Sequence, residues 1–140
     1  MNALTINDAT SRIKDDLSQT PNVADACYRV LDWVCTQPEG ARSHVSLQRL
    51  LKASAVDDLS ELAPVIRYLT GARVPLFNVV YEFVEGDDVE RVDSDALYEA
   101  KHTGEFCHPL TGEVVPDYES KIVVYFAVSD AARSIGGAGR

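Results

Sequence analysis

Three side chains that can bind zinc lie close together in the sequence, because His102, Cys107 and His108 fall within one short segment. Imidazole and thiolate are ligands that zinc prefers, and Cys27 or Cys35 could approach this cluster in the folded chain. A structural zinc site is typically built from two paired-ligand motifs, whereas this sequence offers one loose cluster. The three residues are therefore weak candidates for metal binding, and we expect the protein to use no metal and no cofactor.

The histidines could also act as general bases, with Asp117 or Glu119 to orient one of them. The motifs that would support such chemistry are absent from the sequence: it has no G-x-S-x-G, no phosphate-binding glycine loop and no H-E-x-x-H. A small hydrolase or metal-dependent enzyme is therefore the third hypothesis for this chain, behind two non-catalytic ones. We predict no catalytic residue.

Acidic residues are concentrated in one segment of the chain. The 140 residues carry a formal net charge of −9, from 22 acidic and 13 basic residues. The stretch from Glu82 to Glu119 contains twelve carboxylates against Arg91 and Lys101, a formal −10, whereas residues 1–56 contain six charges of each sign. Any long-range field must come from this stretch, so it is the part suited to attract a basic partner.

Composition excludes several classes of protein. A sequence pI near 4.7 argues against a non-specific binder of nucleic acid or of anionic membranes, since both need surplus Lys and Arg. No apolar run approaches the roughly 18 to 20 residues of a membrane span, and no apolar signal core follows Met1. Three cysteines suit reduced thiols better than a disulfide framework. We expect a cytoplasmic module of bacterial or phage type, with no membrane contact.

Apolar spacing predicts three helices in the first half of the chain. The first helix covers 21–36, where five apolar residues follow the spacing of a buried helical stripe: Val23, Cys27, Val30, Leu31 and Val34. The second covers 47–54. The third covers 58–70, with Asp58 and Glu61 at the spacing of a capping box. Pro64 lies inside the third helix, and either a bent helix or a turn followed by a helix would accommodate it.

Alternating apolar residues predict strands over 76–84 and 121–128. Between them, residues 85–120 form an irregular acidic insertion that contains a short returning strand and a short helix ending near His102. Residues 1–19 are an N-terminal arm or a short helix, and 131–140 are a flexible tail. The expected architecture is α+β, a single domain over 20–130 with a tri-helical core followed by a small antiparallel sheet.

This order of elements resembles that of a winged-helix domain, in which two helices joined by a tight turn precede a β-hairpin, the wing. The resemblance covers about residues 21–128 and depends on element order, without a specific motif. It implies a dimeric transcription regulator whose third helix enters the major groove of DNA, with dimerisation through residues 1–36. The basic residues available for DNA contact are Arg42, Arg49, Lys52 and Arg67. Acidic residues at the start of the third helix and in the long wing oppose DNA binding.

The leading hypothesis is a non-catalytic module, adaptor or inhibitor that binds a protein partner with a basic surface. The partner-binding carboxylates would be Glu85, Asp87, Asp88, Glu90, Asp93 and Asp95, with Phe106, Leu110 and Tyr118 as apolar anchors. In a sharper version, the acidic face imitates nucleic acid and inhibits a nucleic-acid-binding protein. DNA is a partner only under the winged-helix alternative, and a homodimer is a further expectation.

Overall fold

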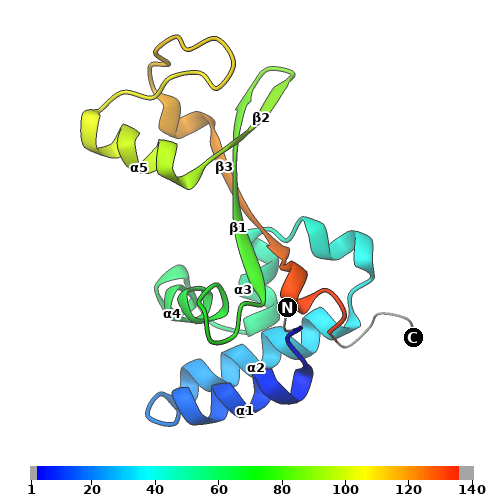
Figure 1. The fold of residues 1–140 in the computed structure, drawn as a ribbon. Helices are drawn as coiled ribbons and strands as arrows, with labels where there is room; N and C mark the ends of the chain where they lie inside the picture. The colour runs from blue at the N-terminus through cyan, green and yellow to red at the C-terminus, as the bar shows by residue number, and fades with distance from the viewer. Residues whose placement is uncertain (1–2, 136–140) are drawn as a thin grey trace. The chain divides into compact units, whose positions relative to one another are not determined.

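The computed structural model describes residues 3–135 and places most of its helices before a small sheet (Figure 1). Over that range it has five α-helices and three strands in the order β2-β1-β3. The predicted α+β class is therefore confirmed. The chain divides into two compact units, which we call the helical unit, residues 1–79 and 126–140, and the acidic unit, residues 80–125. From the sequence we predict one domain over residues 20–130, with no boundary near residues 80 and 125.

The helical unit is built around α2, Pro21–Thr36, which packs against α1, α3 and α4. The other three helices are Ile6–Asp16, Leu47–Ser54 and Leu59–Leu69. The α2 stripe predicted from the sequence faces this core: Val23 is half-buried, and Cys27, Val30, Leu31 and Val34 are buried. Residues 6–16 form a packed helix rather than an arm, since Ala9 and Ile13 are fully buried in the same core.

The start of α4 is fixed by a pair of acidic side chains. The Asp58 carboxylate accepts a hydrogen bond from the Glu61 backbone N–H at 3.0 Å, as the capping spacing predicts. Glu61 reaches back one residue further than in a capping box, and its Oε1 accepts from the Asp57 N–H at 3.0 Å. The helix continues through Pro64 without a break, so the alternative of a turn followed by a helix does not apply.

The C-terminal segment contributes to the core, which corrects the flexible tail predicted from residue 131 onward. Ala132 is fully buried and Ile135 is 2% exposed in the helical unit. The Leu4 N–H also donates to the Ala131 carbonyl at 2.6 Å. Apolar burial and backbone pairing therefore order the chain to Ile135, and the remaining predicted tail, 136–140, lies outside the described residues.

The sheet consists of β1, Phe77–Glu85, β2, Asp88–Val92, and β3, Ile122–Val128. β1 and β2 form an antiparallel hairpin in which Tyr81 lies opposite Val92 and Glu85 opposite Asp88. In the helical unit, Val45 forms an antiparallel bridge with Phe126 of β3, with backbone hydrogen bonds of 2.7 and 2.8 Å. A short extended segment between α2 and α3 thus pairs with β3.

The short returning strand and the short helix predicted inside the acidic insertion 85–120 are both present in the acidic unit. It contains β2, the helix α5 (Ser94–Thr103) and a 3-10 turn at Tyr118–Lys121. Gly104 ends α5 with φ 83°, a left-handed conformation that favours glycine. Cys107 and Val114 bridge as antiparallel partners, so the segment after α5 folds back on itself as a hairpin-like loop.

Candidate functional site

The acidic unit is held by an aromatic core of its own. Phe83, Val92, Ala100, Phe106 and Val115 are buried together in one cluster. The Phe106 ring lies 5.6 Å from that of Phe83 and stacks on Tyr118 at 5.2 Å, measured between centroids. Phe106 was predicted to be an anchor for a partner, but it is 3% exposed because its ring fills this core. The Phe106 ring therefore lies inside the unit, where a partner could not reach it.

The hairpin register places two opposite charges beside each other on the sheet. Glu82 of β1 lies opposite Arg91 of β2, and both reach the hydroxyl of Tyr125 on β3. The Tyr125 hydroxyl donates to Glu82 Oε2 at 2.9 Å and accepts from Arg91 at 3.4 Å. Burial and the neighbouring Glu82 carboxylate raise the pKa of Tyr125. Arg91, one of the few basic residues of the acidic unit, thus takes part in a contact within the unit.

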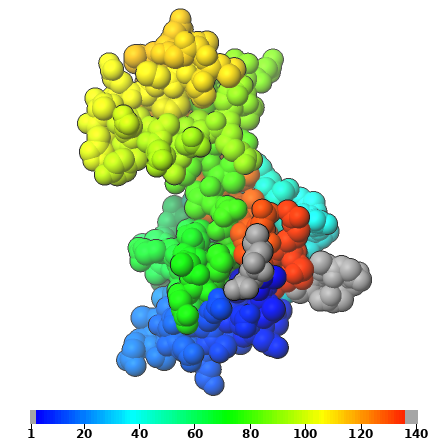
Figure 2. Space-filling model, viewed as in Figure 1, coloured from blue at the N-terminus to red at the C-terminus, as the bar shows by residue number. Residues whose placement is uncertain are grey.

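The whole net charge of the chain resides in the acidic unit. Residues 80–125 carry twelve carboxylates against Arg91, Lys101 and Lys121, a formal −9, and the rest of the sequence carries ten charges of each sign. All of these carboxylates are exposed except Glu82 and Glu90, which are half-buried. The surface in Figure 2 shows the segments near residues 100 (yellow) and 115 (amber) as one continuous face of this unit.

Few of these carboxylates are neutralised within the described part of the unit. Glu85 forms an ion pair with Lys121, whose ammonium group lowers the pKa of the Glu85 carboxyl. Asp117 accepts a hydrogen bond from the Ser120 hydroxyl at 2.9 Å. Asp87, Asp88 and Asp95 of the predicted set are exposed at the hairpin turn and in the first turn of α5. The unit therefore presents a surface of charged carboxylates to solvent.

Exposed apolar side chains occur between these carboxylates. Leu110, predicted as an anchor, is 71% exposed at the tip of the loop, whereas Tyr118 is half-buried against Phe106. Sequence reasoning missed five further exposed apolar residues of this unit: Val89, Tyr98, Val114, Val123 and Val124. Tyr98 could have been found, because it lies off the Leu97 and Ala100 face that the helical spacing turns inward.

The proposed metal ligands are used separately. His108 Nδ1 accepts from the Leu110 and Thr111 backbone N–H groups at 3.1 and 3.3 Å, and its ring lies edge-on to Phe83. His102 Nδ1 is 3.0 Å from the Tyr98 carbonyl, and Cys107 is an exposed thiol. Within residues 3–135, no three side chains of His, Cys, Asp or Glu are grouped to hold a metal ion. The two histidine side chains thus make local contacts, and the Cys107 side chain is exposed.

The basic residues of the DNA hypothesis have different surroundings. Arg42 is 6% exposed and donates hydrogen bonds to the carbonyls of Gln37, Arg133 and Ile135, so it is not available to phosphate. Its burial follows from the ordered C-terminal segment that covers it.

Arg49 is half-buried, with its guanidinium 5.1 Å from the Trp33 ring centroid and 3.1 Å from Gln37 Oε1. Of the four predicted residues, Lys52 and Arg67 are exposed. Only two of the four basic residues predicted to contact DNA are therefore exposed to solvent.

Comparison of the chain with protein-family models, with curated proteins and with solved structures found no match. In the described part of the chain, none of the helices has both the length and the apolar composition needed to cross a membrane.

Proposed function

We propose that the chain is a non-catalytic interaction module whose acidic unit docks onto the basic surface of a protein partner. One observation carries this proposal: the entire net charge is gathered on a unit with its own core, and its exposed carboxylates are mostly without an ionic partner in the described structure. Exposed carboxylates steer association with a basic surface and set its salt dependence, while nearby apolar side chains such as Leu110 supply contact area.

The partner that fits this surface best is a nucleic-acid-binding protein, because its basic groove is built to receive an array of negative charges. By occupying that groove, the acidic unit would inhibit the partner. A competition experiment addresses this step: once a partner is isolated, duplex DNA or RNA at low salt should displace the acidic unit if both use one groove.

The test compares two variants that change the net charge equally. Asp87→Asn, Asp88→Asn and Glu99→Gln remove three exposed carboxylates from the acidic unit. The control, Asp15→Asn, Asp32→Asn and Glu39→Gln, removes three exposed carboxylates from the helical unit. Both are used with wild type to capture partners from a nuclease-treated host lysate, and the binding of the recovered protein is then measured after purification.

We expect the acidic-unit variant to bind about tenfold more weakly at roughly 0.05 M salt and the difference to shrink at roughly 0.3 M. The control variant should match wild type at both concentrations. Equal weakening by both variants would mean that overall charge, not this surface, controls binding, and unchanged binding by both would remove the acidic unit from the interface.

Winged-helix DNA binding is the second candidate. The order α2, α3, α4, β1 and β3, with Val45 paired to β3, supports the resemblance to that family. Against it stand the buried Arg42 and the carboxylates of Asp57 and Asp58 at the start of α4, the helix that would enter the groove. Recovery of one specific DNA fragment by wild type, lost in a Lys52→Ala, Arg67→Ala variant, would favour this function over protein docking.

A further inference from the structure

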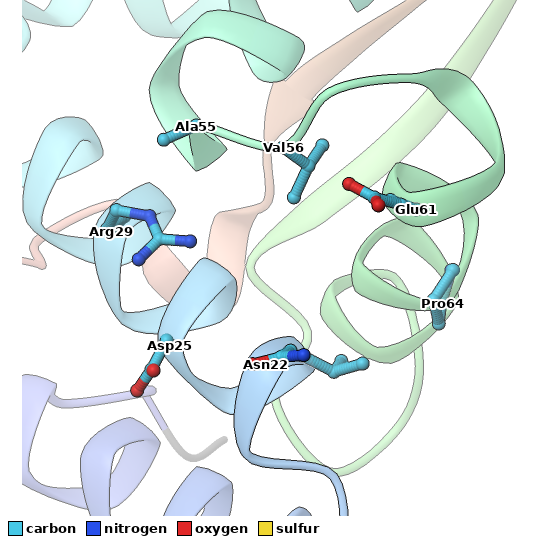
Figure 3. A pocket seen from close by; sticks show the side chains of 8 residues that line it. Asn22, Asp25, Arg29, Ala55, Val56, Glu61 and Pro64 are labelled. Carbon is cyan, nitrogen blue, oxygen red and sulfur yellow. The ribbon is translucent and has the colours of Figure 1, made fainter.

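A cleft in the helical unit has the features of a small-molecule site (Figure 3). It has a volume of about 350 Å³ and lies between α2, the α3–α4 turn and α4. Its volume is at the lower end of the range of about 300–1,000 Å³ typical of ligand pockets. The cleft therefore suits a ligand the size of an amino acid or a short peptide.

Opposite charges face each other across this cleft. The Arg29 guanidinium on α2 and the Glu61 carboxylate on α4 point toward one another from opposite walls (Figure 3). Arg29 and Glu61 carry opposite charges but do not form an ion pair with each other. The ion pairs found among the described residues join other side chains. The space between the two groups is therefore suited to a molecule that carries both charges.

Each of the two charged side chains is held by a hydrogen bond to the backbone. Arg29 Nε donates to the Ser54 carbonyl at 2.7 Å, which leaves the terminal amino groups of the guanidinium directed into the cleft. Glu61 Oε1 accepts the Asp57 N–H at 3.0 Å, which leaves Oε2 for a ligand. Fixing the side chains before binding lowers the entropy lost when a ligand is bound.

The remaining lining is apolar apart from Asn22 and Asp25 on the α2 side. Val23, Val56 and Pro64 are half-buried and offer a wall against which an aliphatic side chain can pack. This wall lies in the same cleft as the two facing charges.

We propose that this cleft binds an α-amino carboxylate with an apolar side chain, as a free amino acid or as a short peptide. Arg29 would receive the carboxylate in a two-pronged hydrogen bond, and Glu61 would receive the ammonium group. The apolar side chain of the ligand would lie against Val56 and Pro64. This site belongs to the helical unit, so it goes beyond the docking function proposed for the acidic unit and does not depend on it.

The test uses L-leucine as the probe. Its binding is measured by isothermal titration calorimetry and by the amide chemical shifts of the protein. Leucine is added up to about 10 mM, because so small a ligand binds weakly. N-acetyl-L-leucine lacks the ammonium charge and L-leucinamide lacks the carboxylate. We expect leucine to bind and each blocked form to bind at least about tenfold more weakly, because each leaves one charged group of the cleft unpaired. L-leucyl-L-leucine tests the second source, a peptide, and the tighter of the two zwitterions identifies the ligand.

Two substitutions connect the binding to the cleft. Glu61→Gln keeps the acceptor for the Asp57 N–H and removes the charge, and Arg29→Lys keeps the charge and removes the two-pronged donor. Both should weaken leucine binding by about tenfold. The matched controls Glu39→Gln and Arg67→Lys change exposed residues outside the cleft and should bind as wild type does.

Three results would overturn the proposal. One is the absence of binding by both leucine and the dipeptide. Another is equal binding of leucine and a blocked form, which would show that the cleft does not recognise one of the two charges of the ligand. The third is wild-type affinity in a folded Glu61→Gln protein, as judged by its amide spectrum.

Discussion

Replacement of Arg42 tests whether a single buried guanidinium holds the C-terminal segment on the helical unit. Its three hydrogen bonds, to the carbonyls of Gln37, Arg133 and Ile135, measure 3.2, 3.2 and 3.0 Å. A typical hydrogen bond contributes about 1 kcal/mol net, so Arg42→Ala should lower the free energy of unfolding by about 3 kcal/mol. Arg42→Lys should recover part of this, because one ammonium group replaces a fork of donors.

Urea unfolding followed by the fluorescence of Trp33, the one tryptophan of the sequence, measures this loss in the helical unit. The control is Arg67→Ala, at an exposed position on α4, which should change stability by no more than about 0.5 kcal/mol. A loss below about 1 kcal/mol for Arg42→Ala would refute the reasoning, because three carbonyls could then lose the buried Arg42 donor almost without cost.

Three further predictions concern the cores and the titratable groups. Phe106→Ala should lower the free energy of unfolding of the acidic unit by about 3–5 kcal/mol. Amides of the acidic unit should then lose their protection from hydrogen exchange, while amides of the helical unit keep theirs. Equal loss of protection in both units would contradict a separate core. Burial raises the pKa of Cys27 to about 12, so in the native protein at pH 8 a disulfide reagent should modify the exposed Cys107 and spare Cys27. The Arg73 guanidinium lowers the pKa of Asp16, so its ionised form stabilises the fold above about pH 4, and this contribution is lost as the pH falls through the lower folded value. The difference in the free energy of unfolding between wild type and Asp16→Asn, measured in urea, should accordingly disappear between about pH 5 and pH 2. A difference that does not change with pH would exclude the ionic contribution.

The parts of the fold that could be predicted from sequence are those set by neighbours along the chain. The stripe from Cys27 to Val34 repeats at helical spacing, and α2 spans the predicted 21–36. Ser46 caps α3 by accepting the Arg49 N–H at 3.2 Å, again a contact three residues apart. Such local patterns do not depend on how the rest of the chain is arranged.

The errors arose where partners are distant in sequence. Arg42 has the composition of a surface residue, and its burial depends on carbonyls more than 90 residues later. Phe106 lies in a loop without helical or strand periodicity, so no pattern indicates that Phe83 and Tyr118 enclose it. The cleft was missed for the same reason, since Arg29 and Glu61 come from helices that meet only in the folded chain.

The acidic unit combines a small core with a large charge of one sign, and the two have opposite effects on its folding. Its buried cluster comprises five residues, whereas its carboxylates repel one another and oppose a compact state. Only part of that repulsion is relieved internally, by the Glu85 pair with Lys121 and by the contact of Glu82 and Arg91 with Tyr125. A basic partner would remove the remaining repulsion, so the charge that weakens the free unit would contribute favourably to the complex. Under the proposed function, this coupling would explain why the charge is gathered on the acidic unit while the helical unit is neutral.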